Sequence, residues 1–320
     1  LDPIRSLTRD FSMATHSGIP VLNPSLTNLD RSLRYYQKSH INPASWFSVV
    51  EQDYHLLLEA LEWKNLFPAR STPYCVLDIG CGTGRFPDLL STYLPESLHV
   101  HYDICDPSQF CLTTCRQALQ APLFPRKSWR TTLEHAEGTW APGSYDVAWA
   151  IQSFYCLNHE SLHDSLRRFI GAIHPTRGTA CIFLGKRNSF RSQTHQLFSQ
   201  QSPFSAPQPY VSAESVFTML DQLGANTVIR ELECVHTISI WEDRLLEQYL
   251  QQCVMDATPL PKWREIAKLR TFLDSFRHGD YYHFPNPCWL ILSVPGSAGQ
   301  EGKHRLQGYL RTVSPARFAS

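Results

Sequence analysis

The stretch YCVLDIGCGTGRFPDLL, residues 74–90, decides how this chain folds. A short apolar run leads to Asp78 and breaks into a loop that carries Gly80, Gly82 and Gly84, and an apolar pair follows at helical spacing. This order predicts a buried parallel strand, a tight turn and the first turn of a helix. Because glycines accept positive φ and a helix N-terminus presents unpaired N–H groups, we expect a polar ligand to lie across this loop.

The spacing of the glycines discriminates between ligands. A dinucleotide fingerprint requires G-x-G-x-x-G, and Arg85 takes the place of its third glycine here. The D-x-G-x-G-x-G form from Asp78 to Gly84 instead resembles motif I of class I S-adenosylmethionine-dependent methyltransferases. That resemblance implies S-adenosylmethionine as the cofactor, with its methionine part on the loop. A plain tight turn and an NAD-binding loop are the alternatives.

The rest of the chain alternates strand and helix signals. Further strands are predicted at Leu98–Cys105, Tyr145–Ile151, Thr179–Leu184, Thr227–Val235 and Cys288–Val294. Residues 121–128 are predicted to be a loop, and Trp129–Leu133 a weak strand. Such regular alternation is typical of an α/β fold with a doubly wound, mostly parallel sheet. With the resemblance, it implies the seven-stranded, Rossmann-like methyltransferase sheet, with added N-terminal helices and a helical insertion.

The chain is predicted to have three parts. Residues 1–70 form an N-terminal arm and a helical lid, with helices at Leu26–His40 and about Ala44–Leu66. Residues 71–294 form the methyltransferase domain, with substrate-side insertions at about 186–211 and 240–283. Residues 295–320 have the composition of a flexible tail.

Composition limits the remaining classes of function. The chain has 29 Lys and Arg against 29 Asp and Glu, and no basic run indicates a nucleic-acid partner. No apolar run is long enough to span a bilayer, and the first residues lack an apolar leader segment. The ten cysteines show no C-x-x-C pair, which favours reduced thiols. We therefore expect a soluble, cytoplasmic monomer without a metal or a membrane partner.

An acid at the end of the second strand is the candidate ribose ligand. Asp106 precedes Pro107-Ser108 about 20 residues beyond the glycine loop, the spacing at which nucleotide-binding folds place a ribose-binding acid. A carboxylate can accept hydrogen bonds from both ribose hydroxyls. Asp103 competes for this role, and an ordinary helix N-cap is the structural alternative for Asp106.

The exit of the strand Tyr145–Ile151 is the candidate acceptor site. In a doubly wound sheet, ligands bind at the carboxyl ends of the strands, so Gln152 and Tyr155 lie where a reacting group would meet the cofactor. An ordinary strand-end amide that bonds to the backbone is the alternative for Gln152.

The chain from about Leu77 to Val294 resembles histamine N-methyltransferase and its relatives. The shared features are the glycine loop, the acid-Pro-Ser turn, Ile151-Gln152 with Tyr155, the segment 212–224 (SAESVFTMLDQLG), the segment 253–261 (CVMDATPLP) and Phe284-Pro285-Asn286 before the last strand. The resemblance implies that Asp78 and the three glycines hold the cofactor with Asp106, and that the Ile151 backbone lies near the sulfonium. It also implies that Gln152 and Asn286 contact the substrate amine and that Tyr155 lines its pocket.

Departures from the family's pattern concern the substrate side. The family's glutamine after the acid-Pro-Ser turn falls on Cys111, and its substrate-pocket tryptophans fall in a stretch that holds Phe190 and Thr194. Its substrate-binding glutamate has no secure counterpart, although Glu51 and Asp53 lie in the region. The cofactor side of the resemblance therefore transfers better than histamine itself.

Transfer of a methyl group from a sulfonium needs an aligned lone pair and a dry, oriented site more than an acid or base. A carboxylate beside an amine favours its charged, unreactive form, whereas amides such as Gln152 and Asn286 orient it with a weaker bias. We expect an N-methyltransferase of a small amine, amino acid or imidazole-type metabolite. An O- or carboxyl-methyltransferase, and a nucleotide-binding protein without transfer activity or an NAD enzyme, are the alternatives.

Overall fold

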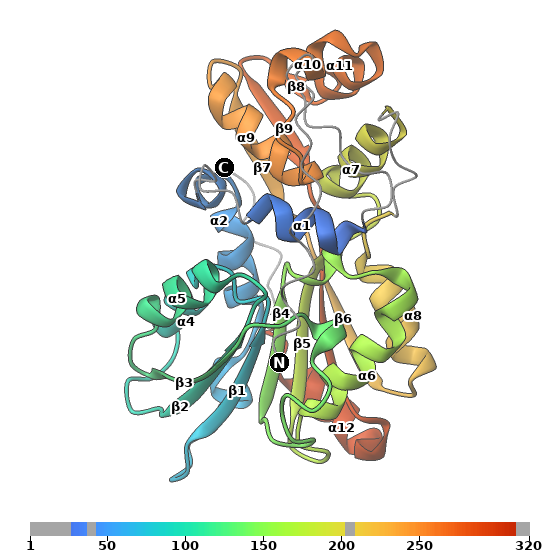
Figure 1. Ribbon diagram of the computed structural model, residues 1–320. Helices are drawn as coiled ribbons and strands as arrows, with labels where there is room; N and C mark the ends of the chain where they lie inside the picture. Colours follow the sequence, from blue (N-terminus) through green and yellow to red (C-terminus); the bar gives the residue numbers. More distant parts are fainter. Residues whose placement is uncertain (1–26, 37–42, 202–208, 312–320) are drawn as a thin grey trace, which may run out of the picture.

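A seven-stranded sheet forms the body of the protein in the computed structural model, which describes residues 27–36, 43–201 and 209–311. The strand order is β3-β2-β1-β4-β5-β10-β6. The strands are β1 (Tyr74–Ile79), β2 (Val100–Cys105), β3 (Leu123–Trp129), β4 (Val147–Ile151), β5 (Thr179–Gly185), β6 (Asn226–Leu232) and β10 (Cys288–Val294). Figure 1 shows β1 to β6 in the lower half of the molecule, and only β10 runs antiparallel to its neighbours. The predicted doubly wound, mostly parallel sheet is confirmed.

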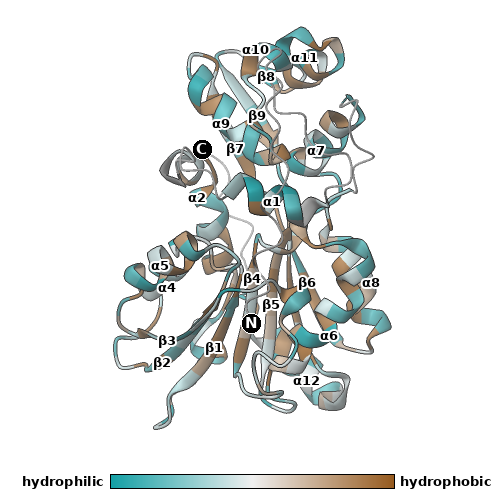
Figure 2. Ribbon diagram, viewed as in Figure 1, coloured by the Kyte–Doolittle hydropathy of each residue, from teal (hydrophilic) through white to brown (hydrophobic). Residues whose placement is uncertain are grey.

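Helices cover both faces of this sheet because its strands are apolar on both sides. Successive residues of β1 point to opposite faces, so Val76 and Leu77 belong to different hydrophobic clusters. One face packs against α3 (Trp63–Leu66), α4 (Arg85–Ser91), α5 (Gln109–Ala118) and part of α2 (Pro43–Ala60); the other packs against α6 (Leu162–Ala172) and α8 (Ala213–Gln222). Figure 2 shows the apolar strands at the centre and hydrophilic residues on the outer helices.

The edge of the sheet beside β2 corrects two predictions. Residues 121–128 are not simply a loop, because β3 spans Leu123–Trp129 and pairs in parallel with β2. The strand expected at Trp129–Leu133 ends at Trp129, and a 3₁₀ turn follows at Leu133–His135. β3 is an edge strand whose side chains are mostly exposed or half-buried, so it lacks the apolar run that marks a central strand.

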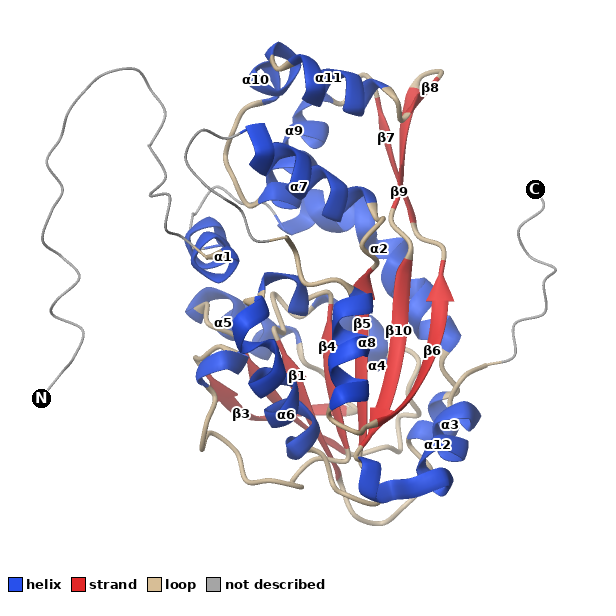
Figure 3. Ribbon diagram, turned by 90° about the vertical axis from the view of Figure 1, so that its right-hand side faces the viewer, coloured by secondary structure: helices blue, strands red, loops and turns tan. Residues whose placement is uncertain are grey.

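A second layer of structure stands above the carboxyl ends of the strands (Figure 3). It holds a small antiparallel sheet, β7-β9-β8, which the sequence did not predict. Its elements are α7 (Phe190–Gln201), β7 (Val235–Ser239), α9 (Asp243–Val254), α10 (Leu260–Glu265), α11 (Ala267–Asp274), β8 (Arg277–His278) and β9 (Tyr281–Pro285). The predicted strand Thr227–Val235 is divided between β6 and β7. The segments expected as substrate-side insertions supply α7 and most of the remaining elements.

The two ends of the described chain pack against the body. The N-terminal helices are α1 (Asn28–Tyr36), α2 and α3; α2 ends at Ala60, where Leu61 forms a bridge with Leu310. The expected tail is corrected by helix α12 (Gly299–Gly308), in which Leu306 is buried. Residues 1–26 of the predicted N-terminal arm and the last nine residues lie outside the described part. Within that part, no helix combines the length and apolarity needed to cross a membrane.

Candidate active site

A cavity of about 670 Å³ opens at the carboxyl ends of β1, β2 and β4, under α1 and α2. Its lining includes Gly80, Gly82, Asp106, Ile151 and Gln152, so residues from three separate predicted motifs meet at one place. The volume lies within the range of about 300–1,000 Å³ that is usual for ligand and cofactor pockets. Parallel strands bring these residues together because their carboxyl ends share one edge of the sheet.

The three glycines of the loop have different structural roles. All three have positive φ, from +53° at Gly82 to +86° at Gly84. A Cβ at Gly80 would lie 2.5 Å from Cβ of Ser153, so glycine allows the turn after β4 to approach the loop. A Cβ at Gly82 would meet open space, whereas one at Gly84 would lie 2.8 Å from Cα of Cys115 on α5. Gly80 and Gly82 line the cavity; Gly84 instead permits α4 and α5 to pack closely.

This difference predicts the outcome of a pair of variants. Both Gly82→Ala and Gly84→Ala place a side chain at positive φ, but only Gly84→Ala also forces a methyl group against a helix backbone. We expect Gly84→Ala to lower the free energy of unfolding by about 1–3 kcal/mol more than Gly82→Ala does. Urea denaturation of the two variants measures the difference, and equal stabilities would contradict the packing role.

Two buried carboxyl groups face the cavity. Asp106 accepts hydrogen bonds from the backbone N–H groups of Gly82 (3.1 Å) and Ser108 (2.8 Å), one on each carboxylate oxygen. Asp78 accepts one from the Tyr102 hydroxyl at 2.8 Å, and that hydroxyl accepts one from Trp149 Nε1 at 2.9 Å. Each Asp106 oxygen therefore keeps a lone pair for a ligand.

Asp103, the competing acid, lies elsewhere. Its fully buried carboxylate forms an ion pair with Arg126 at 2.6 Å and accepts a hydrogen bond from the Tyr145 hydroxyl at 2.9 Å. It does not line the cavity. Asp103 therefore ties β2 to β3 and to the segment before β4, and Asp106 is the acid that faces the ligand space.

Burial makes this site sensitive to pH. Loss of solvation raises the pKa of Asp78 to about 7 and that of Asp106 to about 6. A carboxyl whose pKa is raised by burial stabilises the cofactor-free fold at low pH, where the carboxyl is protonated. This contribution to the free energy of unfolding is lost as the pH rises through the pKa values of Asp106 and Asp78. Binding of a cationic ligand runs the opposite way, because it requires the ionised carboxylates.

We therefore expect the affinity for S-adenosylmethionine to fall as the pH drops below about 6–7, up to about tenfold per pH unit for each carboxyl that must ionise. Calorimetric titration between about pH 5 and 8 measures this dependence. In Asp106→Asn the pH dependence of the remaining affinity should lack the transition near pH 6, which belongs to Asp106, and keep the transition near pH 7, which belongs to Asp78. A constant affinity over the range would show that neither carboxyl meets the cofactor.

The turn after β4 is strained at the predicted acceptor residue. Gln152 has φ +52°, in the left-handed region that a non-glycine residue rarely adopts, and its amide Nε2 lies 3.3 Å from Sγ of Cys288. The Ser153 hydroxyl donates to the Ile79 carbonyl at 2.8 Å and holds the turn against β1. Ile151 and Tyr155 line the same cavity. The Tyr155 hydroxyl lies 2.8 Å from that of Tyr36 on α1.

Asn286 lies behind this turn, in the wall of a small inner cavity of about 30 Å³ that also borders Gln152 and Tyr155. Its Oδ1 accepts the backbone N–H of Arg191 at 3.1 Å, and this contact fixes the orientation of the amide. Nδ2 then faces Nδ1 of His236 (3.0 Å), the Phe284 carbonyl (3.1 Å) and the Tyr249 hydroxyl (3.2 Å). Both amide hydrogens have acceptors within the protein.

The orientation of Asn286 sets the state of its neighbours. Because Nδ2 can only donate, Nδ1 of His236 accepts, and a neutral His236 carries its proton on Nε2. Nε2 lies 2.8 Å from Oδ2 of Asp53 on α2. Of the two N-terminal acids considered for the acceptor, Asp53 thus lines the inner cavity, whereas Glu51 pairs with Arg85 at 2.6 Å. The carboxylate of Asp53 binds His236 through Oδ2, and its Oδ1 is buried without a hydrogen-bond partner among the described residues.

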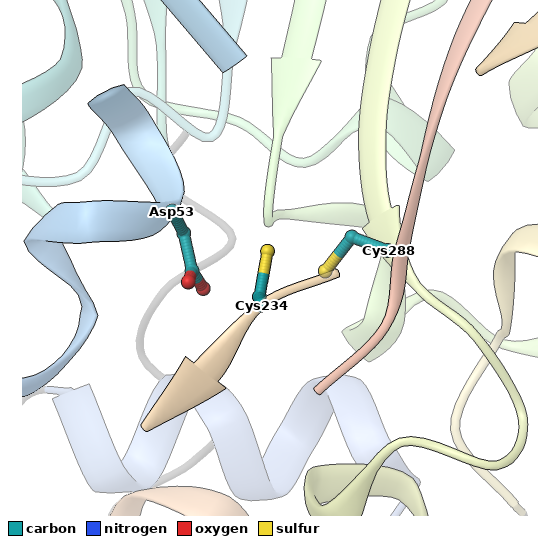
Figure 4. A group of neighbouring side chains, drawn as sticks. All are labelled: Asp53, Cys234 and Cys288. Carbon is teal, nitrogen blue, oxygen red and sulfur yellow. The ribbon is translucent and has the colours of Figure 1, made fainter. Parts of the chain in front are cut away.

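Asp53, Cys234 and Cys288 gather beside the inner cavity (Figure 4). Each offers one ligand atom, and these atoms lie within 4.8 Å of one another, which is close enough for a metal ion. However, the Cys288 thiol donates to the Asn286 carbonyl at 3.2 Å. The contact with Cys288, together with burial, raises the pKa of the Cys234 thiol. Each thiol therefore has a partner within the protein, and the absence of a metal stays a prediction.

The sequence did not single out several residues of the cavity. Phe110 lines it with a ring that is 61% exposed, and Thr132 and Leu133 line the same region beyond β3. Glu134 accepts hydrogen bonds from Asn158 N and Ser161 Oγ instead of edging a ligand. The one available sequence signal was Phe110, an aromatic residue in the first turn of the helix that follows the acid-Pro-Ser turn. An aromatic side chain that is left exposed at such a position often marks a binding site.

The fold and site define a class. The order of the sheet, with one antiparallel strand next to its edge, a glycine loop after β1 and an acid after β2, is that of the Rossmann-like class I methyltransferases. Residues 77–178 match the family model described as a methyltransferase domain. Residues 77–178 therefore match a methyltransferase domain, the fold is that of the class I methyltransferases, and S-adenosylmethionine is the cofactor. The resemblance read from the glycine loop is confirmed at this level.

Solved structures with a similar arrangement are distant in sequence. A Thermotoga maritima methyltransferase described as a possible histamine N-methyltransferase is 16% identical, with 83% of this chain and 97% of that chain covered and a TM-score of 0.43. The Bradyrhizobium japonicum N-methyltransferase NodS is 12% identical (84% and 99% covered, TM-score 0.46). A Leishmania major methyltransferase is 15% identical (66% and 78%, TM-score 0.47). No curated protein matches this chain in sequence. At such low sequence identity, these structures do not indicate the substrate of this chain.

Proposed function

We propose that this protein transfers a methyl group from S-adenosylmethionine to the nitrogen of a small amine, amino acid or imidazole-type metabolite by direct in-line displacement. The observation that carries the proposal is the position of Gln152, which borders both the large cavity and the inner one. A cofactor on the glycine loop and an acceptor at the end of the large cavity that borders the inner one would meet at this residue.

On the cofactor side, we propose that Gly80 and Gly82 cradle the methionine part, that Asp78 attracts its positive charge and that Asp106 accepts the ribose hydroxyls. Gly84 supports the loop from behind. The backbone at Ile151 lies where β4 enters the cavity. The exposed ring of Phe110 and the side chain of Leu133 offer apolar surfaces for an adenine. These residues combine open backbone, carboxylates and flat apolar walls, which suits a cationic nucleoside.

On the acceptor side, the chain supplies orientation and exclusion of water. The cofactor, when bound, provides a methyl group that its sulfonium already activates. Gln152 offers an amide that can donate to or accept from a nitrogen without fixing its charge, and Tyr54, Tyr155 and Trp46 form aromatic walls. Asp53, the acid of the inner cavity, binds His236 through Oδ2, and its Oδ1 has no hydrogen-bond partner in the described part of the chain. An amine attacks in its neutral form, and proximity accounts for most of the rate.

We expect Gln152→Leu to lower kcat/KM for the amine by about 10–100-fold, because the acceptor loses a buried hydrogen bond. The dissociation constant of S-adenosylmethionine should change by less than about threefold. Gln152→Asn, which keeps the amide and tolerates the left-handed backbone, should retain more activity than Gln152→Leu. A Leu variant that is as active as the wild type would remove Gln152 from the acceptor site.

A direct test is a panel of amines, amino acids, carboxylic acids and phenols incubated with labelled S-adenosylmethionine, with the position of the new methyl group read by mass spectrometry. A methyl group on nitrogen is the expected product. The same fold and cavity also accommodate an oxygen nucleophile, so an O- or carboxyl-methyltransferase is the second candidate. A methyl ether or ester as the main product would establish it and overturn transfer to nitrogen.

A further inference from the structure

An arginine stands at the junction of the two cavities. Arg191, near the start of α7, lines both the large cavity and the inner one. Its guanidinium carbon lies 3.7 Å from the ring centre of Tyr155 and 5.2 Å from that of Trp46. Aromatic faces hold a cation in place but leave its charge uncompensated.

No acidic partner neutralises this charge. Across residues 27–36, 43–201 and 209–311, no carboxylate lies within 4 Å of the guanidinium, and its buried Nε has no hydrogen-bond partner. By contrast, Arg85 in the same large cavity pairs with Glu51 at 2.6 Å and with Asp88 at 2.7 Å. An unpaired cation in a protein interior is costly unless a partner arrives from outside.

We propose, on the basis of the N-methyltransferase function above, that the acceptor carries a carboxylate that binds Arg191, so that the substrate is an amino acid. The planar fork of a guanidinium matches a carboxylate through two parallel hydrogen bonds. Arg191 is the only Lys or Arg among the described residues that line the inner cavity, and Asp53, the acid in that lining, binds His236 and not Arg191. The inner cavity does not reach the glycine loop, which places this cation on the acceptor side.

The same charge favours reaction at nitrogen. The substrate's own carboxylate would favour the charged form of its amino group, and pairing of this carboxylate with Arg191 cancels most of that effect and so increases the neutral, nucleophilic fraction. The carboxylate would anchor the substrate at Arg191 and leave the amino group beside Gln152. An amine without a carboxylate would lose the anchor.

The test compares matched substrates: amino acids, the amines obtained by removing their carboxyl groups, and the corresponding aminophosphonates. We expect the wild-type protein to prefer an amino acid over its amine by about 100-fold in kcat/KM, because two charge-assisted hydrogen bonds are lost. Arg191→Gln should abolish this preference, and Arg191→Lys should retain part of it. Arg187→Gln, a change at an exposed neighbouring position, is the matched control that should keep it.

Several results would overturn the proposal. Equal kcat/KM for acid and amine in the wild type would do so, as would a preference for the phosphonate dianion. If Arg191→Gln weakened S-adenosylmethionine binding in calorimetry and left the ratio intact, Arg191 would belong to the cofactor. Thermal midpoints of both Arg191 variants identify loss of fold. If the methyl group were transferred to oxygen but substrates with a carboxylate were still preferred, only the proposal of transfer to nitrogen would be overturned.

Discussion

Replacing Asp106 with alanine should lower the affinity for S-adenosylmethionine by about 100-fold or more, because the ribose in our proposed placement would lose both of its acceptors. The carboxylate is held by the N–H groups of Gly82 and Ser108, one on each oxygen. It is therefore oriented before the ligand binds, and little ordering cost is left at binding. Hydrogen bonds to a charged group are worth about 1.5–3 kcal/mol each, and two of them account for this loss.

The measurement is isothermal calorimetry with the cofactor or its demethylated product. Asp106→Asn keeps the shape but supplies a single acceptor oxygen, so we expect an intermediate affinity. Denaturation of both variants checks the fold, since the loop also loses the contact with Gly82. An unchanged dissociation constant in the alanine variant would refute the role of Asp106 and the placement of the cofactor with it.

Replacing Asp103, three residues earlier, should lower the stability of the fold and leave the affinity for S-adenosylmethionine nearly unchanged. Its carboxylate is fully buried and accepts from Arg126, from the Lys127 N–H and from the Tyr145 hydroxyl. Removing one partner of a buried ion pair costs about 3–5 kcal/mol because the other partner is left unpaired. We expect Asp103→Ala to lower the free energy of unfolding by about 3 kcal/mol, near the lower limit, since Arg126 is half-exposed and can bind water.

Urea denaturation measures this change. At a temperature where the variant is still folded, its affinity for S-adenosylmethionine should stay within about threefold of the wild type. Tyr145→Phe removes only one hydrogen bond of the network and should cost about 1 kcal/mol. If Asp103→Ala bound the cofactor as weakly as Asp106→Ala while remaining stable, the assignment of the two acids would have to be exchanged.

Where prediction failed, tertiary contacts decided the outcome. The segment LFPRKSW became β3 because it pairs with β2 at the sheet edge, although a proline and two cations weaken any strand signal. The glycine-rich segment 299–308 became α12 because Leu306 and Gly302 are buried beside β10; a Cβ at Gly302 would lie 2.9 Å from Val294. Neither contact can be read from local propensity, since each depends on a partner far along the chain.

The sequence by itself determined the cofactor half of this protein. Asp78, the glycine loop and Asp106 lie in short segments whose strand, turn and helix signals are local, and a parallel sheet brings strand ends together in any such fold. Only the tertiary structure decided the acceptor half. Arg191, Asn286 and Asp53 come from three distant segments, and whether each polar group faces a ligand or a protein partner depends on packing. Asp53 contacts His236, and Asn286 accepts the backbone N–H of Arg191. The Arg191 guanidinium, by contrast, packs against aromatic rings, and it therefore remains available for a substrate.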